Sequence, residues 1–253
     1  MLDFHRVHFY PETASGIDLG RIIKDVAQVF TNCSFDVCKP FFSFEHHNKI
    51  DVVERARISE IKQPFERQPK EHKDFDLYGR PTALYDGFEL QRLLASPAFQ
   101  ADNDDDDIHI IFTDLLTCTF SEDDWRYHAR AVICGTPSII STTGMVEAPA
   151  KPREFYISQF GADVNSLKKK LAGRFIDYGD KRMTQVATGY VLQALFFFVT
   201  EGEPFCDSDA CRLYNAHWQE DLIRTQVENP ALCPKHRSLA NKFNRRLAAR
   251  KRI

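Results

Sequence analysis

Three cysteines and one histidine near the end of the chain have the residue types and the spacing of metal ligands. Cys206 and Cys211 are separated by four residues, and Cys233 and His236 by two. Structural zinc sites hold the ion with four thiolate or imidazole ligands, which often arrive as two closely spaced pairs. Because all four ligands are protein side chains, such a site is closed and stabilises the fold instead of catalysing a reaction. The pattern predicts one structural Zn²⁺ ion.

Two other interpretations of these residues stay open. His217 lies between the two pairs and is a reserve ligand if His236 is not one. The residues would otherwise be unrelated buried cysteines and a surface histidine. Gly and Pro residues that end helices lie beside both pairs, and metal-binding knuckles form at such places, which favours zinc. Another close pair, Cys33 and Cys38, has no partner pair elsewhere, so we expect two buried thiols there.

The composition is that of an ordinary soluble globular protein. Hydrophobic residues make up 43% of the 253 residues and charged residues 27%, which excludes a disordered chain. The net charge of -3 argues neither for nor against binding to nucleic acid. Residues 1–16 contain no apolar signal segment, and the seven cysteines are an odd number in a chain too large to need disulfides. We therefore expect a cytoplasmic protein.

The run of residues 183–200 carries no charged side chain and ends just before Gly202 and Pro204. It is at the lower limit of length for a membrane span, but Gln185 and Gln193 interrupt it. A helix that is apolar on all sides is typical of the centre of a globular protein. The sequence therefore predicts a long buried helix over 181–201, capped by Asp180, and no association with a membrane.

The elements before this helix follow strand and helix patterns in turn. Apolar residues alternate, or run continuously, over the expected strands 7–10, 35–44, 108–112 and 154–159. Residues 129–134 and 137–141 are expected to form two short strands or a hairpin. Apolar residues recur at helical spacing, or charged residues surround them, over the expected helices 19–30, 51–61, 86–94 and 165–172. This order predicts an α/β fold with a mixed sheet.

We expect one domain over 1–253, in which 1–180 forms the sheet part and 181–253 holds the central helix, the zinc knuckle and a C-terminal helix. Leu239, Phe243 and Leu247 are four residues apart and arginines lie between them. This spacing predicts an amphipathic helix that lies on the body of the protein.

An apolar helix, a glycine, Cys-x4-Cys and a closing pair of ligands together resemble the archaemetzincins, a family of metzincin-clan metalloproteases. In that family the zinc helix HExxHxxGxxH runs directly into Cys-x4-Cys, and a further Cys-x2-Cys closes a second, structural zinc site. Here Cys206 and Cys211 correspond to the first pair. Cys233 and His236 correspond to the second pair, with His in place of the last Cys and a somewhat longer intervening loop. The resemblance implies a metzincin-like mixed sheet and a C-terminal zinc knuckle.

The same alignment places no metal ligand and no general base on the helix. Counting back from Cys206, the turn glycine falls on Gly202 and is present. The sequence departs from the family's pattern at the three histidines and the glutamate, which fall on Leu195, Val199, Phe205 and Phe196. Three imidazoles hold the catalytic zinc in such enzymes and a carboxylate deprotonates its water, which hydrocarbon side chains cannot do. We therefore expect no catalytic residues of this kind.

These observations lead to three hypotheses. The first is a protease-inactive relative, a pseudoenzyme that binds a protein or peptide partner which the sequence does not identify. The second is an active metallopeptidase with other ligands, although the adjacent His46 and His47 would point to opposite faces of a strand. The third is a nucleic-acid-binding zinc module that uses Arg245, Arg246 and Arg250. The third is less favoured, because a docked helix also presents basic residues to solvent.

Overall fold

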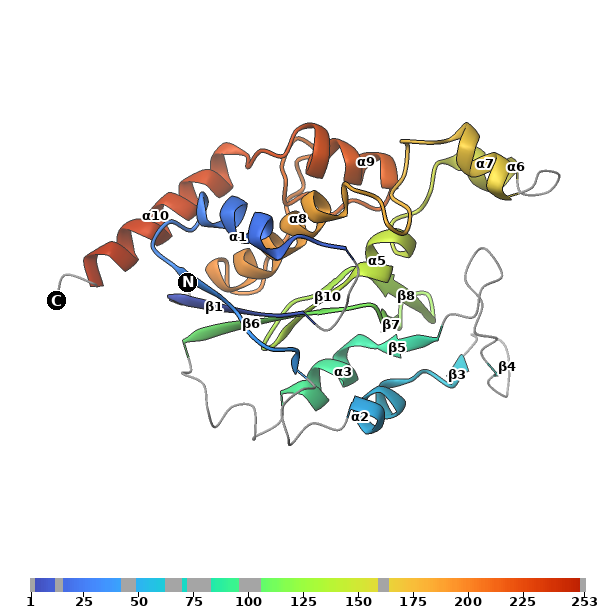
Figure 1. Cartoon of the computed structure of the whole chain (residues 1–253), viewed down its shortest axis with the longest axis horizontal. Coiled ribbons are helices and arrows are strands. Elements are labelled where there is room, and N and C mark those ends of the chain that lie inside the picture. Colours follow the sequence, from blue (N-terminus) through green and yellow to red (C-terminus); the bar gives the residue numbers. More distant parts are fainter. Residues whose placement is uncertain are drawn as a thin grey trace.

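A five-stranded sheet is the centre of the fold (Figure 1). The computed structural model describes residues 3–11, 16–41, 49–61, 70–71, 83–95, 106–158 and 164–250. The strands of the main sheet are, in spatial order, β2 (Ser34–Val37), β1 (Arg6–Pro11), β6 (Asp107–Thr113), β10 (Ser138–Ser141) and β9 (Val132–Ile133). All neighbours are parallel except β9, which is antiparallel to β10. The predicted mixed sheet is confirmed.

Two smaller sheets lie beside the main one. The first has the order β5-β7-β8, from the strands β5 (Leu84–Asp86), β7 (Leu116–Ser121) and β8 (Arg126–Arg130). The second pairs β3 (Glu60–Ile61) with β4 (Lys70–Glu71).

Helices cover both faces of the main sheet (Figure 1). The helices α1 (Leu19–Ala27), α8 (Met183–Val199) and α10 (Pro234–Arg250) lie on one side, and α2 (Lys49–Ala56) and α3 (Gly87–Leu94) lie on the other. Successive side chains of a strand point to opposite faces. Val7 and Phe9 of β1 therefore join the core beneath α8, while Tyr10 joins the core beneath α3.

Shorter helices connect these layers. They are α5 (Thr142–Glu147), α6 (Arg153–Ser158), α7 (Val164–Lys170), α9 (Gln219–Ile223) and the π-helical turn η2 (Arg224–Glu228). Residues 154–159 were expected to form a strand, and this prediction is wrong. Phe155 is buried against Leu167 and Phe175, whereas Ile157 is 73% exposed. The apolar run Phe155–Ile157 therefore belongs to a short helix with one buried side and not to a strand.

Two other boundaries also differ from the prediction. The strand expected over 35–44 ends at Val37, and Pro40, which follows, has no N–H to donate to a sheet. The remainder of that stretch, 42–44, lies outside the described residues. The helix expected over 51–61 ends at Ala56.

The helix α8 is the predicted central helix, and nearly all of its side chains are buried. Asp180 does not cap it. The N-cap is Arg182, and the Asp180 carboxylate instead accepts hydrogen bonds from the backbone N–H of Arg182 (2.8 Å) and from its guanidinium. None of the helices in the described part of the chain has the length and the apolar run that crossing a bilayer requires.

The C-terminal helix α10 is amphipathic, as its spacing predicts. Phe243 is fully buried, and its ring centroid lies 4.7 Å from that of Phe4 and 5.5 Å from that of Phe30. Lys242, the neighbouring residue, is exposed. One apolar side of α10 therefore closes the core above β1 and α1.

We expect Phe243→Ala to lower the free energy of unfolding by about 3–5 kcal/mol, because it removes a ring and leaves a cavity beside the rings of Phe4 and Phe30. Lys242→Ala should change it by less than about 0.5 kcal/mol, because Lys242 faces solvent. Urea unfolding followed by circular dichroism measures both. Equal effects of the two substitutions would show that α10 does not pack on the core as described.

Candidate metal centre

The end of α8 turns the chain toward the first pair of cysteines. Glu201 and Gly202 both have positive φ angles, 59° and 116°, and the N–H of Gly202 donates to the carbonyl of Phe197 at 2.8 Å. A glycine adopts such a φ without strain, so the glycine that the sequence predicts at the turn has a structural role here. The chain then runs to Cys206, whose N–H donates to the carbonyl of Leu213 at 2.9 Å.

The second pair of ligands is positioned by the start of α10. Cys233 directly precedes Pro234, the first residue of the helix, and His236 lies in the first helical turn. Proline fits this position because its missing N–H would have no partner within the helix. A local turn therefore brings each pair of ligands together, and the packing of α10 against α8 brings the two pairs together.

The four predicted ligands form one cluster. Their ligand atoms all lie within 4.8 Å of one another. The Sγ atoms of Cys206 and Cys233 are 4.0 Å apart, and Nδ1 of His236 lies 3.7 Å from Sγ of Cys211 and 3.1 Å from Sγ of Cys233. Tetrahedral zinc requires about 3.8 Å between two thiolates and about 3.6 Å between sulfur and nitrogen. The cluster therefore fits a tetrahedral ion with small shifts.

Backbone N–H groups point at the sulfur atoms. Ser208 donates to Sγ of Cys206 at 3.4 Å, and Leu213 and Cys233 donate to Sγ of Cys211 at 3.5 and 3.4 Å. Such bonds stabilise thiolates, which are the form that binds a metal. The cluster thus has the outer hydrogen bonds of a metal site as well as its ligands.

The pKa values in the absence of an ion reflect burial and these donors. Burial raises the pKa of the Cys211 thiol. Burial also acts to raise the pKa of Cys233, but hydrogen bonds from the backbone of His236 and Lys235 and from the two other thiols outweigh it and lower that pKa. Burial, together with the charge of Lys235, lowers the pKa of His236 and favours the neutral imidazole that binds metals.

The side chains of α8 that face this region are hydrocarbon. Leu195, Phe196 and Val199, the positions assigned to two histidines and the glutamate, are buried in the main core. The ring of Phe196 contacts the ring of His236 edge-on, with centroids 5.4 Å apart. Phe205, the third histidine position, is 40% exposed. None of these side chains can hold a metal.

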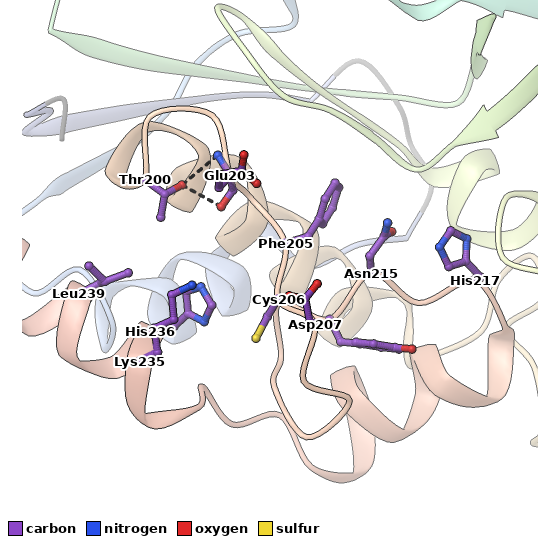
Figure 2. A pocket seen from close by; sticks show the side chains of 11 residues that line it. Thr200, Glu203, Phe205, Cys206, Asp207, Asn215, His217, Lys235, His236 and Leu239 are labelled. Atoms are coloured by element: carbon purple, nitrogen blue, oxygen red, sulfur yellow. Dashed lines mark hydrogen bonds between the residues drawn. The ribbon is translucent and has the colours of Figure 1, made fainter. Parts of the chain in front are cut away.

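A pocket of about 910 Å³ opens beside the cluster (Figure 2). Cys206 and His236 form part of its wall, and His217, Phe205 and Lys235 also line it. His217 is thus a pocket residue and does not belong to the four-ligand cluster. Sequence patterns could not have revealed this pocket, because its walls come from a loop, a turn and the start of α10.

No other group of three or more potential ligands comes together in the part of the chain that the structure describes. His46 and His47 lie outside that part. Cys33 and Cys38, expected as buried thiols, are both only half-buried.

Comparison with known proteins assigns the family. Residues 3–243 match the "Probable metallopeptidase family (DUF6775)". The chain belongs to this family. The match includes the sheet and all four residues of the cluster, and it confirms the predicted relationship to metallopeptidases.

One solved structure similar to this one is the crystal structure of an archaemetzincin from Methanopyrus kandleri. The two proteins share 11% sequence identity, the similarity covers 96% of each chain, and the TM-score is 0.48. No curated protein matches the sequence.

We expect His236→Ala to weaken zinc binding by more than about 100-fold, because loss of an outer-shell partner alone costs 10- to 100-fold. His217→Ala should retain zinc, since His217 lies outside the four-ligand cluster. Metal analysis and competition with a chromogenic chelator measure both. The reverse result, zinc lost with His217→Ala and kept with His236→Ala, would make His217 the fourth ligand.

Proposed function

We propose that this chain is a non-proteolytic member of its metallopeptidase family, with one structural Zn²⁺ ion held by Cys206, Cys211, Cys233 and His236. The observation that carries the proposal is the burial of Leu195, Phe196 and Val199 in the main core. In an active enzyme of this kind, these three positions would carry two metal ligands and a general base facing a water-filled cleft. Here they carry apolar side chains that pack in the interior.

Zinc at the cluster would add a link between two segments that are distant in the chain. It would connect the loop after α8 to the start of α10. The ring of Phe196 packs edge-on against the imidazole of His236 and would help to hold it in place. With four protein ligands it leaves no open coordination position for substrate or water. The role of the ion is therefore to stabilise the fold. Reduced thiols at this site fit a reducing compartment, and we propose a cytoplasmic location.

Metal stoichiometry and a peptidase assay together test this proposal. We expect the purified protein to bind one zinc ion per chain tightly and to leave mixed peptide substrates uncleaved, with and without added zinc. Chelation should lower the melting temperature, because an ion bound only by the folded state stabilises it. Two tightly bound ions per chain, or cleavage that a chelator abolishes and that co-purifies with the protein, would instead indicate an active metallopeptidase with other ligands.

A binding role is the function that remains, and the pocket beside the cluster is where we place the partner. Its wall combines an exposed aromatic ring, Phe205, with charged groups of both signs, among them Glu203 and Lys235 (Figure 2). A pocket of this size, with a few polar groups around apolar surface, suits a peptide side chain and its backbone.

We expect members of a pool of short peptides to raise the melting temperature of the zinc-bound protein, because they bind only the folded state. Phe205→Ser should remove this shift. Phe88→Ser is the matched control, since Phe88 is 60% exposed on α3, on the other side of the sheet. An equal loss of the shift in both variants would place the partner elsewhere.

The nucleic-acid hypothesis gains no support from the basic helix. Arg246 and Arg250 both form ion pairs with Asp3, so part of the positive charge of α10 is neutralised within the protein.

A further inference from the structure

A second group of chemically competent side chains lies on the far side of the main sheet from the metal cluster. His8 is on β1, Asp107 begins β6, and Cys38 directly follows β2. These three strands are neighbours, and Tyr10, two residues after His8, belongs to the core beneath α3. Side chains two residues apart on a strand share a face, so His8 lies on the face that α2 and α3 cover (Figure 1).

The three side chains form a continuous chain of hydrogen bonds. Nε2 of His8 lies 2.9 Å from Oδ2 of Asp107, and Nδ1 of His8 lies 3.6 Å from Sγ of Cys38. An ionised carboxylate only accepts hydrogen bonds, so Nε2 carries the proton and Nδ1 offers its lone pair to the thiol. Cys38 thus donates to His8, and His8 donates to Asp107.

Asp107 is held in place as an orienting group. Its side chain is only 3% exposed, and Arg6 lies 3.8 Å from its Oδ2. Its other oxygen, Oδ1, has no hydrogen-bond partner among the residues that the structure describes. A buried, unpaired carboxylate oxygen costs free energy and is often kept for a functional reason. Here the carboxylate can stabilise a positive charge on His8.

A second imidazole, that of His109, lies against His8. The ring of His109 stacks on that of His8, with centroids 5.0 Å apart and planes at 10°. Burial lowers the pKa of His109 to about 4, so His109 is neutral at neutral pH, and its Nδ1 is hydrogen-bonded to the Tyr10 hydroxyl at 3.1 Å. The more exposed His8 also lies 4.0 Å from the Asp36 carboxylate.

We propose that Cys38, His8 and Asp107 form a second reactive centre, which transfers acyl groups from small esters or thioesters through an acyl-Cys38 intermediate. A nucleophile, a base within reach and a third group that orients the base are the parts that this chemistry needs. The base must also return its proton to the leaving group. His8 can take the proton from the Cys38 thiol and then give it to the leaving group.

The reaction has two stages, acylation of Cys38 and hydrolysis of the acyl-Cys38 intermediate. Sγ of Cys38 attacks the carbonyl carbon while its proton moves to Nδ1 of His8, and Asp107 stabilises the imidazolium. The bond to the leaving oxygen or sulfur breaks, and the leaving group takes the proton from His8. Water then attacks the acyl-Cys38 carbonyl and gives its proton to His8. The bond to Sγ breaks, the thiol recovers that proton, and a carboxylic acid is released.

The surroundings of the thiol fit this role. Burial raises the pKa of Cys38, so the thiol is protonated at rest and needs a base to react. The strand β2 is at the edge of the sheet, and Cys38 itself is only half-buried. Cys33, the other cysteine of this region, donates instead to the carbonyl of Phe4 at 3.8 Å.

Acetylation of the zinc-bound full chain by p-nitrophenyl acetate tests the proposal. Peptide mass spectrometry should find the acetyl group on Cys38, and Cys38→Ser should remove it. His8→Ala should slow nitrophenol release by about 100-fold or more, the usual contribution of a general base, and added imidazole should restore part of the rate. Asp107→Asn should slow it by a smaller factor. Cys33→Ser should react at the rate of the unmodified protein.

Acetylation spread over several cysteines, or an unchanged rate in His8→Ala, would overturn the proposal. Zinc content and thermal unfolding show whether each variant is folded. If the His8 variants do not fold, the unmodified protein decides the question: a native chain in which Cys38 reacts no faster than Cys33 has no activated thiol.

Discussion

The burial of α8 is the constraint on which the rest of the structure depends. This helix contacts α1, α5, α10 and the sheet, so each of its sides must be apolar. A helix that carries a catalytic metal needs one side that is polar and open to a cleft. One residue cannot both be apolar for burial in the core and be polar and open to a cleft. Leu195, Phe196 and Val199 satisfy the first requirement and therefore cannot satisfy the second.

The candidate metal cluster lies next to the C-terminal end of this buried helix. Between α8 and α10 the chain passes through a segment that includes α9 and η2, and bringing the two ends of such a segment together costs conformational entropy. Four ligands drawn from both ends of this segment would offset that cost when an ion binds. The contact between Phe196 and His236 joins the apolar interior to the cluster. Phe196, at the position aligned with the family's glutamate, therefore contacts the candidate metal ligand His236.

The two faces of the main sheet differ in chemistry. The face beneath α8 is entirely hydrocarbon along β1 and β6, with Phe9 and Ile110 among its side chains. The opposite face begins with polar groups at His8 and Asp107 and becomes apolar only toward Tyr10 and Ile111. The polar cluster therefore lies at the start of these parallel strands, where this face of the sheet does not contribute to an apolar core.

The sequence by itself determined the elements whose signal is local. The apolar run at 183–200 predicted α8, the four-residue spacing around Phe243 predicted α10, and the short spacings of Cys206–Cys211 and Cys233–His236 predicted two pairs of ligands. Each of these depends on residues within a few turns of one another. The apolar run Phe155–Ile157 misled, because a short apolar run occurs in a strand and in a short helix alike.

Only the tertiary structure decided which distant residues meet. His8 and Asp107 are 99 positions apart and come together because β1 and β6 are neighbours in the sheet. The order of strands follows from how the whole core packs, and no local pattern specifies it. The positions of His236 and His217 depend on packing in the same way. The packing of α10 against α8 places the imidazole of His236 among the thiols, and His217 lies in the wall of the pocket.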